Sequence, residues 1–447
     1  MSTGKIQQKS SGFEIENCSS RDEFFGRRSR LLFIAYDFPP SMSIACVRTF
    51  NLAMFLSRLG WDVTVVTPHP SVWLKVDRPE MVEADLEREQ IQRILTQHHW
   101  RWLGAQYLNC WNRNLGWLIG GFCRKIARRL HIDSQIGWIK AVEQSCSTLA
   151  PEDVDVILAS GPPFAAFKLA KRLSDRLGRP YVLDYRDPWT GNPHGPSSGR
   201  AQMRAEANLL AGCAAATVVS RSWSLALDQC FQIGSKLHVI TNGYDPEGLA
   251  AVMPHNFDHF AIVYAGIFYP PKRVITPVMA ALKRLRETAH SSGWYFHYYG
   301  EAEDHVREEA KRFDVVDRVI IHGRVPRMEA LSAIRGAGVA VVITSVSHDG
   351  DLADKGIMTG KIFDALGLGT PTLVIGPPGN DLDSITETTG LARSFTGNDI
   401  DGIASFLREA LWGRTPASKD TSAYAWPHLA RRFNTVLCEA VFAKMPT

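Results

Sequence analysis

The sequence predicts an α/β fold of two facing Rossmann-like domains. Short apolar runs bounded by Gly, Pro and Asp alternate with longer amphipathic stretches, which is typical of parallel sheets covered by helices. This pattern occurs twice, and 447 residues are enough for about two to four domains. Since ligands of open α/β sheets bind beyond the carboxyl ends of the strands, we expect a site where two such edges face each other.

The apolar runs place the expected strands, and the amphipathic stretches place the helices. Strands are expected at 31–35, 63–67, 156–159, 181–184, 216–220 and 238–241 in the first half, and at 261–265, 295–299, 319–322, 339–344 and 372–375 in the second. Helices are expected at 48–59, 164–177, 274–288 and 361–366. Residues 247–259 show no clear period, so we expect the linker between the domains there.

The composition excludes several classes of protein. Hydrophobic residues make up 45% and charged residues 21%, so the chain is neither globally disordered nor a coiled coil. The net charge of +4 does not support nucleic-acid binding. The eight cysteines include no Cys-x-x-Cys pair, so neither a disulfide framework nor a zinc site is indicated. Because there is no signal-like leader and no run of about 18 apolar residues, we expect a cytoplasmic protein.

One segment differs from the alternating pattern. Residues 100–131 contain four of the twelve tryptophans and six Lys or Arg residues, without any Asp or Glu. Aromatic rings and clustered cations suit the surface of an anionic bilayer, so a peripheral membrane contact is expected. A helical hairpin that packs its aromatic side chains onto the first domain is an equal alternative, and nucleic-acid binding is a weaker one. The residues expected at the membrane are Trp102, Trp111, Trp117, Arg124, Lys125, Arg128 and Arg129.

Short motifs follow the expected strands in a definite order. No Gly-x-Gly-x-x-Gly follows the first strand, so a nicotinamide or flavin dinucleotide site is not supported. The motifs are Phe38-Pro39-Pro40, a small-residue loop with Ser43 before Arg48, residues 155–163, Asp184-Tyr185-Arg186-Asp187-Pro188-Trp189, residues 241–245, Tyr264-Ala265-Gly266, residues 322–325 and residues 361–371. In this order they resemble the landmarks of family-4-type retaining glycosyltransferases over nearly the whole chain.

The resemblance implies a B-type glycosyltransferase fold. It implies an acceptor domain at 30–250, with the insertion at 100–131, and a nucleotide-sugar domain at 258–420. Residues 1–29 are expected to be a disordered lead-in, and residues 421–447 to form a helix that returns to the first domain. No cofactor is implied, because in this fold class helix N-termini and basic side chains hold the donor diphosphate without a metal.

Four residues of the second half are expected to bind the donor diphosphate. Gly266 would let the backbone approach a phosphate closely. Lys272, Arg273 and Lys361 would supply positive charge beside it. For Lys272 and Arg273, which follow two prolines, the alternative is a solvated position at a helix start.

The sequence departs from the family at one carboxylate. Many members have two Glu separated by seven residues, and the second position falls on Asp364, which can still accept from ribose hydroxyls. The first falls on Gly356, so Asp349 and Asp351 are the candidates for its contact with the sugar. Asp349-Gly350-Asp351 also matches the Asp-x-Asp metal motif of A-type glycosyltransferases. Since the same spacing recurs elsewhere by chance, no metal is expected.

Asp187 and Arg186 are the catalytic candidates. Members of the family often have a His at this strand end, where the chain has Tyr185-Arg186-Asp187. Asp187 would steady positive charge on the sugar carbon or orient the acceptor hydroxyl, and Arg186 would hold a phosphate or pair with Asp187. An ion pair that only caps the following loop is an equal alternative. Ser43 and Arg48 are expected to meet a phosphate of the donor or the acceptor.

The leading hypothesis is a transferase that moves a sugar from a nucleoside-diphosphate sugar to a sugar or lipid-linked acceptor, with retention. Synthesis of a polysaccharide, lipopolysaccharide or glycolipid is the expected setting. A nucleotide-sugar epimerase on the same scaffold is one alternative. A glycosyltransferase-like protein that binds a nucleotide or lipid without turnover is another, because fold alone does not decide function.

Overall fold

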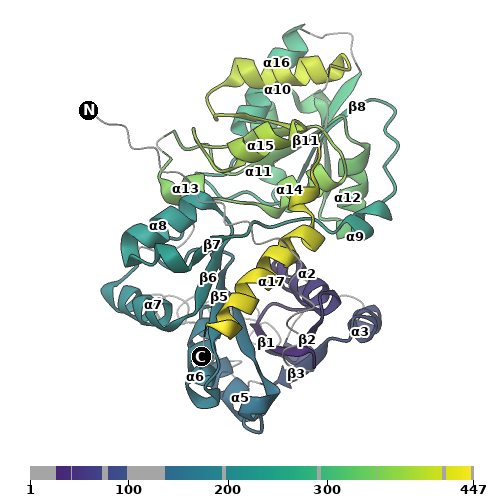
Figure 1. Ribbon diagram of the computed structural model, residues 1–447. Coiled ribbons are helices and arrows are strands. Elements are labelled where there is room, and N and C mark those ends of the chain that lie inside the picture. The colour runs from purple at the N-terminus through teal and green to yellow at the C-terminus, as the bar shows by residue number, and fades with distance from the viewer. Residues whose placement is uncertain are drawn as a thin grey trace, which may run out of the picture.

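The computed structural model describes residues 27–41, 43–72, 79–97, 136–193, 198–288, 293–348, 350–414 and 419–443. Within them the chain forms two parallel sheets, and each sheet has helices on both faces (Figure 1). The expected α/β fold of two Rossmann-like domains is confirmed.

The first domain contains a seven-stranded sheet in the order β3-β2-β1-β4-β5-β6-β7. Its strands are β1 (Ser29–Ala35), β2 (Trp61–Pro68), β3 (Gln92–Thr96), β4 (Val156–Gly161), β5 (Tyr181–Tyr185), β6 (Ala215–Val218) and β7 (Leu237–Val239). Its helices are α2 (Ala45–Arg58), α3 (Pro79–Arg88), α5 (Ile136–Ser145), α6 (Ala165–Leu177), α7 (Arg200–Gly212), α8 (Arg221–Phe231) and α9 (Pro246–Ala250).

The second domain contains a six-stranded sheet in the order β10-β9-β8-β11-β12-β13. Its strands are β8 (Phe260–Ala265), β9 (Trp294–Tyr299), β10 (Val319–Gly323), β11 (Val339–Ile343), β12 (Thr372–Ile375) and β13 (Ala392–Phe395). Its helices are α10 (Thr276–Thr288), α11 (Glu303–Arg312), α12 (Arg327–Gly336), α13 (Leu352–Lys355), α14 (Gly360–Gly367), α15 (Leu382–Thr389) and α16 (Ile400–Leu411).

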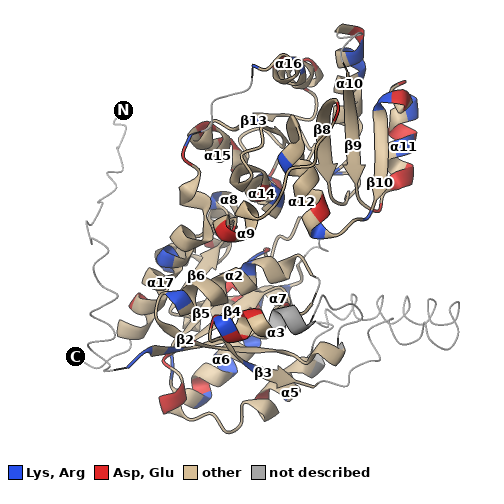
Figure 2. Ribbon diagram, turned by 90° about the vertical axis from the view of Figure 1, so that its right-hand side faces the viewer, with Lys and Arg blue, Asp and Glu red and all other residues tan. Residues whose placement is uncertain are grey.

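Local sequence explains how the helices begin, pack and end. In α6 the buried residues recur every three or four positions, so one apolar stripe faces the sheet. The helix ends at Gly178, whose φ of 68° is a left-handed conformation that glycine adopts without strain. In α11 Glu303 and Asp304 lie in the first turn and Lys311 and Arg312 in the last, and charges placed in this way interact favourably with the helix dipole (Figure 2).

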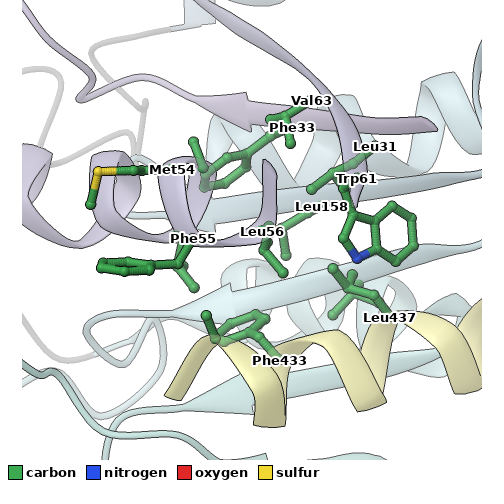
Figure 3. Packing of buried hydrophobic residues seen from close by; sticks show 14 of the residues in the cluster. Leu31, Phe33, Met54, Phe55, Leu56, Trp61, Val63, Leu158, Phe433 and Leu437 are labelled. Carbon is green, nitrogen blue, oxygen red and sulfur yellow. The ribbon is translucent and has the colours of Figure 1, made fainter. Parts of the chain in front are cut away.

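The C-terminal helix α17 (Trp426–Phe442) returns to the first domain, as expected. Phe433 and Leu437 pack against α2 and β2, where they share a core with Phe55 and Trp61 (Figure 3). The Trp61 indole donates a hydrogen bond of 2.7 Å to Oδ1 of Asn434. The last helix is therefore part of the core of the first domain.

The carboxyl edges of the two sheets face each other. Helix α8 starts directly after β6, and its first turn bonds to segments that follow β11 and β12. The Asn242 side chain, which follows β7, donates to the carbonyl of Met358 at 3.2 Å. Residues from both edges therefore meet at the junction of the domains.

Every expected strand is present, and β3 and β13 were not expected. Both lie at the outer end of a sheet, and each has one buried residue and polar residues among the others, so neither gives a continuous apolar run. The expected linker at 247–259 starts with most of the short helix α9.

Membrane contact is not addressed by the described residues. None of their helices combines the length and the apolar character that a membrane span requires. Trp102, Trp111, Trp117, Arg124, Lys125, Arg128 and Arg129 lie outside the described part of the chain, as do residues 1–26.

Candidate functional site

Gly266 follows β8 at the carboxyl edge of the second sheet. Its φ is 145°, and a Cβ atom there would lie 1.9 Å from Nζ of Lys361. Its amide donates to the carbonyl of Tyr299 at 2.8 Å, and its own carbonyl accepts from the Tyr298 hydroxyl at 3.0 Å. A side chain at this position would displace the lysine, so the glycine keeps the ammonium against the main chain.

Lys361 lies in the first turn of α14 and is partly buried. Its Nζ donates to the Tyr264 hydroxyl at 3.3 Å and lies 4.5 Å from the centre of that ring. Burial, reinforced by the charge of Arg273, lowers the pKa of Lys361 to about 7. Among the described residues no carboxylate is within ion-pair distance of it.

Arg273 is a second cation at this edge and is buried, with 8% of its surface exposed. Its Nε donates to the Thr344 carbonyl at 3.4 Å, and its guanidinium lies 5.2 Å from the Tyr269 ring centre. Paired main-chain hydrogen bonds between Tyr269 and Arg273 hold the loop. A buried and a partly buried cation that meet no carboxylate among the described residues, a glycine backbone and a helix N-terminus together form an arrangement suited to an anion.

The other donor-side candidates are bonded to protein groups. Lys272 pairs with Asp354 at 2.7 Å, so it is not the solvated lysine of the alternative interpretation. The Asp351 carboxylate caps α13 by accepting from the amide of residue 354 at 2.9 Å. Asp364 forms a bidentate pair with Arg327, at 2.9 and 3.2 Å, so a ribose hydroxyl would have to compete with a guanidinium.

The Asp-x-Asp metal motif is only half described, because Asp349 lies outside the described residues. Within the described ranges no three His, Cys, Asp or Glu side chains are grouped so that they could hold a metal ion.

Arg48, for which a phosphate contact was expected, is bonded to protein groups. It is 3% exposed, and its Nη2 is 2.7 Å from Oδ1 of Asp184. The five N–H groups of the guanidinium are used by Asp184, the Asn242 side chain and the carbonyls of Ile240 and Thr241. Arg48 thus ties α2 to β5 and to the segment after β7, and its expected contact with a phosphate stays a prediction.

Asp184 completes this buried pair. Burial alone would raise its pKa, but the charge and hydrogen bonds of Arg48 outweigh burial and lower it. The hydroxyls of Ser160 and Thr217, on β4 and β6, each donate to the same carboxylate at 2.8 Å. Asp184 therefore joins three neighbouring strands, β4, β5 and β6, near their carboxyl ends.

Arg186 and Asp187 follow β5 directly. The Arg186 Nη2 lies 3.2 Å from Oδ2 of Asp37, and the same nitrogen donates to the Pro162 carbonyl. The partner of Arg186 is therefore Asp37 of the first loop, and its Nε has no acceptor in the part of the chain that the structure describes. Asp187 is half-buried in the turn that follows.

Ser43 acts within its own loop. Its hydroxyl accepts from the amide of Ala45 at 3.3 Å, and its carbonyl accepts from the amide of Cys46 at 3.0 Å. These bonds prepare the start of α2.

Sequence reasoning missed Glu206, which lies fully buried on α7. One of its oxygens accepts from the amide of Thr190 at 3.0 Å, in the loop that carries Asp187. Burial raises the pKa of Glu206 to about 7. No motif surrounds this residue, so only the fold reveals that it holds the loop.

Asp37, Tyr264 and Asp354 were also missed as partners of charged residues. Asp37 follows the first strand and could have been found from that position. Tyr264 and Asp354 meet Lys361 and Lys272 only through the packing of distant segments.

Comparison with known proteins agrees with this architecture. The profile of the glycosyl transferase 4-like domain matches residues 46–243. No curated protein sequence matches the chain.

Solved structures share the fold over nearly the full chain. Sucrose-phosphate synthase from Thermosynechococcus elongatus is 14% identical, with a TM-score of 0.57 over 93% of this chain and 97% of its own. The lipopolysaccharide outer core galactosyltransferase WaaB is 13% identical, with a TM-score of 0.57 over 93% and 100%. HepE from Anabaena, in complex with UDP and glucose, is 14% identical, with a TM-score of 0.54 over 92% and 97%. The chain therefore has the GT-B glycosyltransferase fold, and its residues 46–243 correspond to a glycosyl transferase 4-like domain.

Proposed function

We propose that this protein transfers a sugar from a nucleoside-diphosphate sugar to a hydroxyl of a sugar or lipid-linked acceptor, with retention of configuration. The setting we propose is the synthesis of a polysaccharide, lipopolysaccharide or glycolipid. The second domain would bind the donor, and the first domain the acceptor. The UDP and glucose bound by HepE support a donor of this class.

One observation carries the proposal, namely the Lys361 ammonium held over Gly266 beside Arg273. When the bond between the sugar and the diphosphate breaks, negative charge develops on the leaving phosphate. Preorganised cations and helix N–H groups stabilise such charge without the reorganisation that water would need. We therefore assign the leaving diphosphate to these side chains and to the N-terminus of α14, and we propose a reaction that needs no metal.

Asp187 is our candidate for the side chain that acts at the reacting sugar carbon. It lies at the carboxyl end of β5, in a loop fixed by the Arg186 and Glu206 contacts. A carboxylate there would steady positive charge on the sugar carbon or orient the acceptor hydroxyl. The leaving phosphate would accept the proton of the acceptor.

The test is a panel of UDP-, GDP- and other nucleotide sugars. Thermal shifts report binding, and slow donor hydrolysis reports bond cleavage without knowledge of the acceptor. We expect at least one nucleotide to raise the melting temperature and its sugar to be released with the donor's anomeric configuration, read by NMR before mutarotation. No response to any nucleotide would refute the proposal.

The same panel separates the alternatives. With an epimerase, the product would be a nucleotide sugar of altered configuration in which the sugar is still bonded to the diphosphate. A binding protein without turnover would shift the melting temperature but release no sugar.

We further propose that residues 100–131 contact an anionic membrane surface. The basis is the sequence alone, six cations and four tryptophans without an acidic residue. Co-sedimentation with phosphatidylglycerol vesicles should fall when Arg124, Lys125, Arg128 and Arg129 are replaced by Ser. Unchanged sedimentation, or none in the wild type, would favour a hairpin packed on the first domain.

A further inference from the structure

The first domain reaches the second through the first turn of α8. The Trp223 indole, 5% exposed, donates from Nε1 to the Ala353 carbonyl of α13 at 2.8 Å. The amide and hydroxyl of Ser222 donate to the two carboxylate oxygens of Asp381 at 2.7 and 2.8 Å. Figure 1 shows α8 directly beside α13. Three hydrogen bonds from two adjacent residues therefore cross between the domains.

This contact requires a glycine at position 356. A Cβ atom on Gly356 would lie 2.1 Å from Cδ1 and 2.4 Å from Nε1 of Trp223. A Cβ atom does not approach a non-bonded heavy atom so closely, and the indole itself is buried. Trp223 therefore occupies the space that a side chain at 356 would need, at the position where the family resemblance expects a glutamate.

Helix α13 connects this contact to Lys272 and Arg273 of the second domain. It has four residues and is too short to hold its place alone, so its surroundings fix it. Asp354, next to Ala353, accepts from Nζ of Lys272 at 2.7 Å. Lys272 directly precedes Arg273. The path from the indole to Arg273 thus consists of two hydrogen bonds and adjacent residues of the chain.

We propose that Trp223 and Ser222 are positioning residues through which the first domain sets the donor site of the second. The indole bonds to α13 directly, and Ser222 acts through Asp381, whose amide donates to the Lys355 carbonyl of α13 at 3.0 Å. Helix α13 in turn fixes Lys272 and, through it, Arg273. Only the last link, to the donor diphosphate, rests on the proposed function. The absent glutamate at 356 is thereby explained as room for an interdomain contact.

The first test uses the full chain without ligand. Hydrogen exchange of the amides at 354–357, which bond within and just after α13, should be roughly fivefold faster in Trp223→Phe, which keeps a ring but loses the N–H donor. Trp412→Phe, at an exposed tryptophan after α16, is the matched control and should leave these amides unchanged. Equal exchange in wild type and Trp223→Phe would overturn the proposal.

The second test measures coupling between the two positions. Gly356→Ala alone should accelerate the same amides, because its Cβ collides with the indole. In a Trp223→Leu background, which removes the obstructing ring, Gly356→Ala should add no further acceleration. Additive effects of the two substitutions would mean that they do not share this contact, and would also overturn the proposal.

A third measurement links the contact to the donor. Trp223→Phe should weaken, by roughly three- to tenfold, binding of the nucleotide that gives the largest thermal shift in the panel. Unchanged affinity alongside faster exchange would overturn the link to the donor site. A panel without any response would refute the proposed function, while the exchange experiments would still decide whether Trp223 holds α13.

Discussion

Both sheets bury charged side chains at their carboxyl edges, but in opposite ways. In the first domain each buried cation meets a carboxylate, Arg48 with Asp184 and Arg186 with Asp37. In the second, Lys361 contacts a hydroxyl and a ring face, and Arg273 a carbonyl and a ring face. Burying a cation without an anion costs free energy, and a bound anion would offset this cost. The comparison teaches that the paired edge serves stability, and we propose that the edge where Lys361 and Arg273 meet no carboxylate among the described residues is prepared for an anionic ligand.

The largest effect should come from breaking the paired edge. Asp184→Ala leaves the Arg48 guanidinium buried without its carboxylate, and should lower the free energy of unfolding by about 3–5 kcal/mol. Urea unfolding measures this. The matched control is Asp175→Ala, which breaks an exposed pair with Lys171 and should cost less than about 1 kcal/mol. Equal losses at the two positions would contradict the structural role of the Arg48 pair.

Glu206 should make the stability of the first domain depend on pH. Its pKa is raised to about 7 from an ordinary 4.5, so the folded state holds a proton that the unfolded chain has released. Its contribution to stability is complete below pH 4.5 and is lost as the pH rises through 7, a change of about 3 kcal/mol. Glu206→Gln should remove this part of the slope, and Glu143→Gln on α5 should not. A slope that survives in Glu206→Gln would contradict the assignment.

The strands could be predicted because most of them are continuous apolar runs, and periodicity detects such runs. Edge strands β3 and β13 lack that signal. The roles of the site residues were harder to predict, because the role of a side chain depends on a partner that is distant in sequence. Arg48 was expected at a phosphate, yet its partner lies 136 positions further along the chain.

The contact at Gly356 could not be predicted either, because its partner is also distant in sequence. The sequence shows a glycine where a carboxylate was expected, but not that Trp223 of the other domain fills the space. By contrast, Gly266 and Lys361 were predicted together, because both belong to short motifs at strand ends. Short motifs therefore predict the roles of residues within one loop, whereas contacts between distant segments become visible only in the folded structure.

Removing the unpaired charge should separate binding from stability. Lys361→Met keeps the length and apolar stem but removes the ammonium, so nucleotide-sugar binding should weaken roughly 10- to 100-fold. Because no ion pair is lost among the described contacts, urea unfolding should show unchanged or increased stability. Lys283→Met, at an exposed position on α10, is the matched control for both measurements. A loss of stability as large as that of Asp184→Ala would remove the contrast between the edges.

The smallest effect is a change of donor affinity with pH. The pKa of Lys361 in the free protein is about 7, and a bound diphosphate would favour its charged form and raise that pKa. Binding must then take up a proton above pH 7, and affinity should fall by up to about tenfold per pH unit until the pKa of the complex is reached. A nucleotide sugar is the right probe, since its diphosphate has no proton to lose in this range. Calorimetry in buffers of different ionisation enthalpy would count the proton directly. Lys361→Arg stays charged and should bind with no such slope, whereas a flat profile in the wild type would mean that the ammonium does not meet the diphosphate.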